Sequence, residues 1–220
     1  MSDASSPFAG ARTSMIDLCH EIERMLGGLT DSHGRVADEI HQVRKAGKRL
    51  RGALMMAGEP KPCLRWIAVI GRMLGGSRDA TVRVKTWTAL TAGETEIGSA
   101  EAAADGLLAL EAQAANRKPP QAVVDWSLAA VAQIRGRLEA REDLEFAEQV
   151  AVGADKLRRQ LRKRLKRALQ RVSNEDFHDC RKAAKAWLGG LSVVAPDFVH
   201  PATPAAEKVA GTLGQENDLE

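Results

Sequence analysis

Apolar residues recur every three or four positions along most of the chain, which is the spacing of helices with one buried face. Between residues 40 and 54, Ile40, Val43, Gly47, Leu50 and Leu54 follow this rhythm. Alternation of apolar and polar residues, which is typical of strands, is missing, and Tyr is absent while Ala is abundant. Because Ala favours helices and aromatic residues favour strands, we predict an all-α fold.

Glycine and proline divide this helical pattern into about ten helices. We expect them at residues 14–28, 33–57, 62–75, 79–92, 97–116, 120–150, 154–172, 174–195 and 203–214, with a last one starting near residue 217. Gly153 is taken as the stop between the sixth and the seventh. Residues 1–13 are expected to be disordered, and residues 14–220 to form the folded domain.

A short motif occurs twice along the chain. His-x-x-Arg-Lys-x-x-Lys starts at His41 and again at His178, 137 residues later, and Leu74-Gly75 matches Leu213-Gly214 at an offset of 139. Such a duplication predicts two helical bundles related by an approximate twofold axis, at about residues 14–115 and 120–220. The chain ends just after the second Leu-Gly pair, so we expect its last helix to be cut short.

The charges are strongly segregated, although the net charge is only +3. Residues 41–85 carry 11 Lys and Arg against two acids, and residues 156–185 carry 12 against three. The segments between and around these two blocks are acidic. A concentrated positive potential attracts polyanions, so the two basic blocks predict one divided anion-binding site.

Each copy of the motif places its histidine and three cations on one stripe of a helix, because they stand at i, i+3, i+4 and i+7. In the first copy the stripe extends to Arg51 and covers about 15 Å, which can follow several consecutive phosphates. Arginine would supply forked contacts and lysine adjustable point charges. The alternative is a solvated basic face opposite the apolar seam.

Taken together, "EIHQVRKAGKRLRGAL", "LGGSRDATV", "DFHDCRKAAK" and "LGQENDLE" resemble the CHAD family, the conserved histidine α-helical domain, over roughly residues 14–220. The resemblance implies two four-helix bundles around a basic groove that binds inorganic polyphosphate without catalysis. It also implies a cytoplasmic protein that accompanies CYTH-type enzymes or polyphosphate granules. In the second copy Ala186 and Leu188 stand where the first has Arg49 and Arg51, so its motif helix offers fewer donors.

The resemblance assigns polyphosphate binding to cations of both copies. In the first copy these are His41, Arg44, Lys45, Lys48, Arg49 and Arg51, with Arg78 further along the same basic block. In the second they are His178, Arg181, Lys182 and Lys185. The upstream helix also contributes, and by spacing we favour Arg158, Arg159, Arg162, Lys163 and Lys166 over the row Arg164, Arg167 and Arg171.

Other functions are less consistent with the sequence. Neither motif histidine has a second His, Cys or carboxylate at i+3 or i+4, so we expect no metal ligation; capping or packing is their alternative role. Single-stranded nucleic acid is the second candidate ligand, but the stripes contain few aromatic residues for stacking. No P-loop pattern is present and acids are scarce among the bases, so we expect no catalytic residue and no cofactor.

The compartment is also predicted from the sequence. Cys19, Cys63 and Cys180 stand singly, without the spacing of a disulfide framework or zinc site, which is typical of a reducing compartment. We expect no signal peptide and no membrane span.

Overall fold

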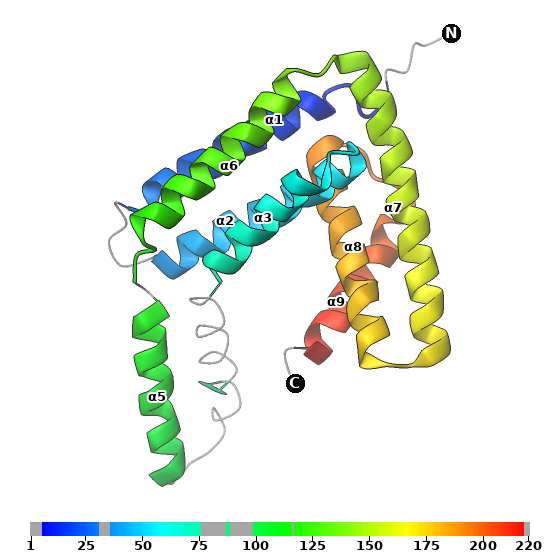
Figure 1. The fold of residues 1–220 in the computed structure, drawn as a ribbon. Coiled ribbons are helices and arrows are strands. Elements are labelled where there is room, and N and C mark those ends of the chain that lie inside the picture. Colours follow the sequence, from blue (N-terminus) through cyan, green and yellow to red (C-terminus); the bar gives the residue numbers. More distant parts are fainter. Residues whose placement is uncertain (1–5, 31–35, 76–86, 89–98, 116, 218–220) are drawn as a thin grey trace.

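The computed structural model describes residues 6–30, 36–75, 87–88, 99–115 and 117–217, and the following account concerns these residues (Figure 1). This part of the chain contains helices and no strand, which confirms the predicted all-α class. Eight helices are defined in it: α1 (Ala11–Gly28), α2 (Val36–Met56), α3 (Lys61–Met73), α5 (Ser99–Ala115), α6 (Gln121–Glu139), α7 (Asp143–Arg171), α8 (Asn174–Val194) and α9 (Thr203–Asn217). The helix predicted at 79–92 falls almost entirely outside the described residues, as does the one expected after residue 217.

The first helix starts earlier than expected. Helix α1 begins at Ala11, which is fully buried, and Phe8 is 9% exposed and belongs to the hydrophobic core. Both residues lie in the stretch 1–13 for which disorder was predicted. Their burial anchors residues 8–11 to the core, and residues 1–5 lie outside the description.

The predicted helix over residues 120–150, with a stop at Gly153, is wrong. Helix α6 ends at Glu139, Ala140–Glu142 form a turn, and α7 then runs without interruption through Gly153. A Cβ at Gly153 would lie 1.9 Å from the carbonyl oxygen of Met56. This glycine therefore permits close packing of α7 against the end of α2, and it does not stop a helix.

A buried carboxylate holds the turn between α6 and α7. Glu59 follows the end of α2 with only 1% of its side chain exposed, and its two oxygens lie 3.3 Å from Arg137 Nε and 3.0 Å from Arg141 Nη1. Arg141 also donates to Gln149 Oε1 and stacks over the ring of Phe146. The chain turns here because this charge cluster fixes it, without a glycine or proline.

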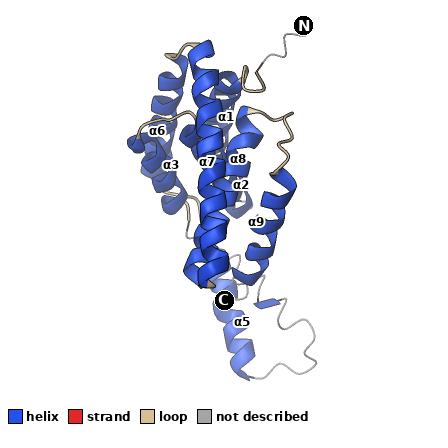
Figure 2. Ribbon diagram, turned by 90° about the vertical axis from the view of Figure 1, so that its right-hand side faces the viewer, coloured by secondary structure: helices blue, strands red, loops and turns tan. Residues whose placement is uncertain are grey.

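The helices form two groups that meet along α2 and α8. Helices α1, α2, α3 and α6 pack on one another, while α8 packs against α7 on one side and α9 on the other. Figure 1 shows α2 and α8 converging toward their C-terminal ends, so that their N-terminal halves diverge. Helix α5 extends away from both groups, as Figure 2 also shows.

Two glycines allow the backbones of α2 and α8 to touch. A Cβ at Gly52 would lie 2.3 Å from the carbonyl oxygen of Ala186, and one at Gly190 would lie 2.9 Å from the carbonyl carbon of Gly52. No larger residue fits at either position without moving a helix. This crossing determines where the two motif helices lie relative to each other, because each motif begins 11 or 12 residues before it.

Candidate functional site

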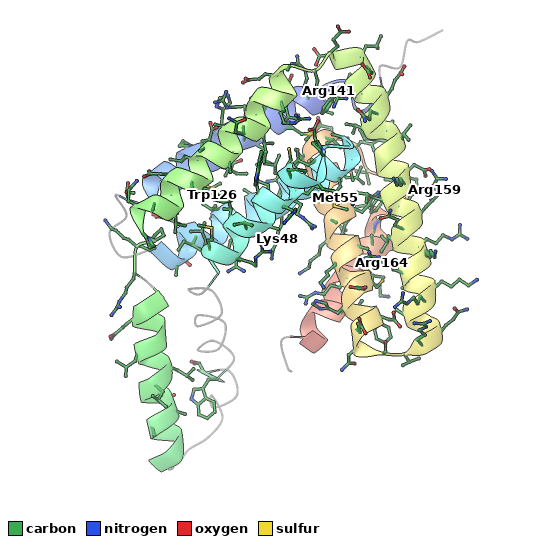
Figure 3. The ribbon with its side chains drawn as sticks, in the orientation of Figure 1. Lys48, Met55, Trp126, Arg141, Arg159 and Arg164 are labelled. Carbon is green, nitrogen blue, oxygen red and sulfur yellow. The ribbon has the colours of Figure 1, made fainter. Side chains whose placement is uncertain are left out.

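Helix α2 presents its basic stripe to solvent because the opposite face is buried. Val43, Leu50 and Ala53 on that face are at most 1% exposed. On the stripe, His41, Lys45, Lys48 and Arg51 are exposed. Figure 3 shows Lys48 on the side of α2 and α3 that faces the space between the two motif helices.

The remaining two arginines of this helix are half-buried and contact neighbouring helices. Arg44 Nη1 donates to the carbonyl oxygen of Gly75 at 2.9 Å, just after the end of α3. A cation is favourable there because the last carbonyls of a helix lack partners within it. Arg49 Nε donates to Ser192 Oγ of α8 at 3.2 Å. Both residues therefore have a structural role in addition to the predicted anion contact.

The second stripe lies on α8 and repeats this arrangement in part. His178, Lys182 and Lys185 are exposed, and Arg181 is half-buried. The Nε of Arg181 is buried and has no hydrogen-bond partner among the described residues. Lys182 Nζ lies 3.7 Å from Asp179 Oδ1, an exposed contact that neutralises little of its charge.

A cavity of about 430 Å³ adjoins the first stripe. Helices α2 and α3 form most of its wall. Four cations line it: Arg44, Lys48 and Arg51 from α2, and Arg72 from the last turn of α3. The sequence places Arg72 in the first basic block, but only the packing of α3 on α2 brings it beside the motif.

A family model described as CHAD domain matches residues 20–220. The chain belongs to the CHAD family. No curated protein and no solved structure matches it. The family match confirms the resemblance on which the candidate residues were selected.

In this CHAD chain, helix α7 carries basic residues on two different faces. Arg164 Nη1 donates to the Asp179 carbonyl oxygen of α8 at 3.1 Å, and Arg167 Nε lies 2.5 Å from the buried carboxylate of Asp176. Spacing alone favours a different row of α7 for ligand binding, the one that contains Arg158 and Arg159. In that row Arg158 and Arg159 share the carboxylate of Asp155, at 2.8 and 2.9 Å.

Figure 3 shows Arg159 on the side of α7 away from α8 and Arg164 on the side toward it. Arg162, Lys163 and Lys166 are exposed on α7. The structure thus brings Arg164 and Arg167 next to the second motif helix, and directs Arg159 elsewhere. Arg78, the remaining candidate, lies outside the described residues.

Ser173 and Asp176 hold the start of the second motif helix. Ser173 Oγ accepts from the backbone N–H of Asp176 at 3.2 Å and is 3.0 Å from its Oδ2. Ser173 is thus the N-cap of α8, and Asp176 complements the positive end of the helix. The bond to Arg167 joins this cap to α7, so the first turn of α8 and the basic row of α7 form one unit.

The described residues contain no group of three His, Cys, Asp or Glu side chains that could hold a metal ion. Burial raises the pKa of Cys180, although nearby Arg164 opposes it, and burial raises the pKa of Cys19 to about 12. These thiols therefore stay protonated near neutral pH and are poor nucleophiles. No helix in the described part of the chain is long and apolar enough to cross a membrane.

Proposed function

We propose that this CHAD chain binds inorganic polyphosphate, without catalysis, along the basic stripes of α2 and α8. The observation that carries the proposal is the placement of exposed cations on two helices that pack directly against each other. Family membership supports it independently. The bound polymer would contact both stripes within one chain, with Arg164 of α7 reinforcing the second.

An internal twofold axis would relate the two stripes. Three packing relations support this symmetry: α1, α2 and α3 pack in the same order as α7, α8 and α9; α1 contacts α8 as α7 contacts α2; and α2 contacts α8 itself. Gly52 and Gly190 face each other at the centre of that last contact. Helix α6 completes a four-helix bundle with α1, α2 and α3.

Linear polyphosphate suits these stripes better than nucleic acid does. The polymer carries about one charge per phosphate and has no bases, whereas single-strand binding sites usually add aromatic side chains on which bases stack. Two aromatic residues lie in the α8 motif region: Trp187 is 1% exposed, and Phe177 packs against the hydrophobic core, so neither presents a free face for stacking. The energy of binding would come from ion pairing with release of counterions, and would weaken steeply with added salt.

The test is a competition experiment. Fluorescent polyphosphate bound to the chain is titrated with unlabelled polyphosphate or with single-stranded RNA, matched in phosphate concentration. We expect polyphosphate to displace the probe at a lower concentration than RNA, and no phosphate to be released when magnesium is added. Equal displacement by RNA would reject the preference for polyphosphate, and released phosphate would reject the non-catalytic role.

The histidines would add a pH dependence. A phosphate beside His41 or His178 favours the imidazolium form, so affinity should rise as the pH falls through about 6.5. Binding of polyphosphate at pH 5.5 and pH 8 tests this. Equal affinities at the two pH values would mean that the histidines do not contribute charge to polyphosphate binding.

A further inference from the structure

The cavity between α2 and α3 has a feature that a bare phosphate chain does not need. Beneath its four cations, its wall is mainly apolar and includes Val43 from α2, with Ile67 and Ile70 from α3. Inorganic polyphosphate has no apolar part with which to cover such a wall. A stripe that bound only phosphates would gain nothing from a hollow of this kind.

Small residues on both helices create the space. Gly47 of α2 faces α3, and Ala68, Gly71 and Gly75 lie along α3 and just after it. A Cβ at Gly71 would meet no atom within 4 Å, so this position opens into empty space. The volume of about 430 Å³ falls within the range of small-molecule sites.

The cations are placed at the mouth of this space. Lys48, Arg51 and Arg72 are exposed, whereas Val43, Ile67 and Ile70 are at most 5% exposed. Between these cations lie the partly exposed Gly47, Ala68 and Gly71, with Val43, Ile67 and Ile70 packed beneath them, so the cavity has a charged entrance and an apolar floor of small residues. The complementary ligand is a compact molecule with two or three phosphates at one end and a largely apolar ring system at the other.

We propose that this cavity binds a nucleoside di- or triphosphate, with its phosphates on the α2 stripe and its base over the partly exposed Ala68 and Gly71 of α3. The proposal rests on the proposed function, because it takes the phosphate contacts from the same stripe. It differs in assigning the apolar floor a ligand of its own. Long polyphosphate and the nucleotide would then compete for Lys48 and Arg51.

The decisive comparison is between ATP and inorganic tripolyphosphate, measured by calorimetry without divalent metal at one salt concentration. Both have three phosphates, and only ATP has a base and a sugar. Burial of part of the ring against the apolar wall should make ATP bind about tenfold more tightly. Equal affinities, or tighter binding of tripolyphosphate, would overturn the proposal.

A variant that fills the cavity without changing any charge provides the second arm. In Gly71→Leu the new side chain would occupy the site of the base, so the affinity for ATP should fall to that for tripolyphosphate while long polyphosphate still binds. Gly136→Leu is the matched control, because Gly136 is exposed on α6 and a Cβ there also meets nothing within 4 Å. Unchanged ATP binding in folded Gly71→Leu would contradict the proposal.

A third variant separates this inference from the proposed function. Arg72→Gln should weaken ATP and tripolyphosphate by the same factor and leave their ratio unchanged, whereas a changed ratio would place the base elsewhere. If wild-type protein binds polyphosphate but shows no preference for ATP, only the nucleotide site fails. If it binds no polyphosphate at all, the proposed function fails, whatever the result with ATP.

Discussion

Helices α2 and α8 begin with the same motif, yet their surroundings use its cations differently. In α2, Arg44 and Arg49 bond to neighbouring helices, and exposed Lys45, Lys48 and Arg51 remain on a stripe that Arg72 of α3 extends. A duplicated motif therefore sets which helix lies at each position, while the neighbouring helices determine how many cations that helix can offer a ligand.

Helix α8 lacks the later arginines, having Ala186 and Leu188 at those positions. Helix α7 supplies cations in place of these missing arginines, because its Arg164 and Arg167 reach the first turns of α8. The first half thus carries most of its exposed cations on the motif helix itself, whereas the second depends more on the neighbouring α7. Three predictions test this comparison, and a fourth concerns the ion pair at the start of α7.

The crossing shared by the two helices should be the most sensitive point. Gly52→Ala would force a Cβ to within 2.3 Å of the Ala186 carbonyl oxygen, so we expect a loss of about 3 kcal/mol in the free energy of unfolding. Gly136→Ala, in open space on α6, should gain about 0.5–1 kcal/mol. Urea denaturation measures both. A Gly52→Ala variant as stable as wild type would mean that the helices do not touch there.

Removing two lysines from either stripe should affect the halves unequally. At 0.1 M salt we expect Lys45→Ala with Lys48→Ala to weaken polyphosphate binding by roughly tenfold or more, and to reduce the salt slope by about 0.7 per lysine. Lys182→Ala with Lys185→Ala should cost less, because Arg164 of α7 stays beside the second stripe. Titrations at two salt concentrations measure both quantities, with Ala in place of the exposed Arg24 of α1 as a control. Equal losses of polyphosphate affinity from the two double variants would show that the two stripes contribute equally.

The two faces of α7 give a finer comparison. Arg164→Ala should reduce polyphosphate affinity by about fivefold, the loss of one phosphate contact at 0.1 M salt. Arg159→Ala should have little effect, because Arg159 pairs with Asp155 and lies on the side away from α8. The same binding assay distinguishes them. A greater loss from Arg159→Ala would place the ligand on the outer face of α7.

The smallest effect concerns an exposed ion pair between the start of α7 and α1. A hydrogen bond from Arg12 holds the pKa of Asp143 below its usual range. A depressed carboxyl pKa in the folded state adds stability above the ordinary pKa near 4, and this stability disappears as the pH falls through the folded pKa. Asp143→Asn should therefore lower the melting temperature slightly at pH 7 and not at pH 2.5. Asp17→Asn, at an exposed position of α1, is the control, and a loss that persisted in acid would have another cause.

The helical class and most helix positions follow from the sequence because apolar spacing is a local property. The break between α6 and α7 does not, since it occurs in a charged run without glycine or proline and depends on Glu59, which is distant in the sequence. The acidic first turn of α7, Asp143 and Glu145, is the one local signal that was available. The helix stop predicted at Gly153 is wrong for a related reason. The absence of a side chain at Gly153 lets the backbone of Met56, which belongs to another helix, pack closely against α7.

The candidate site shows the same limit. The motifs identify α2 and α8, but which arginines bond to other helices depends on packing, as with Arg44 to Gly75 and Arg49 to Ser192. Spacing on α7 could not separate its two basic faces, because cations stand nearly all around its apolar seam. Arg72 and the apolar cavity wall also required the contact between α2 and α3.

We propose that one polyphosphate chain contacts both motif helices at once, and the two motif histidines can report on this directly. The sequence has five histidines, which can be followed individually in the NMR spectrum of protein labelled at the imidazole nitrogens. On titration with polyphosphate of defined length, we expect the signals of His41 and His178 to shift together and to saturate at one polymer per protein. The signals of His20 on α1 and His200 before α9 should stay in place. Shifts confined to one motif histidine, or equal shifts at His20, would contradict the account.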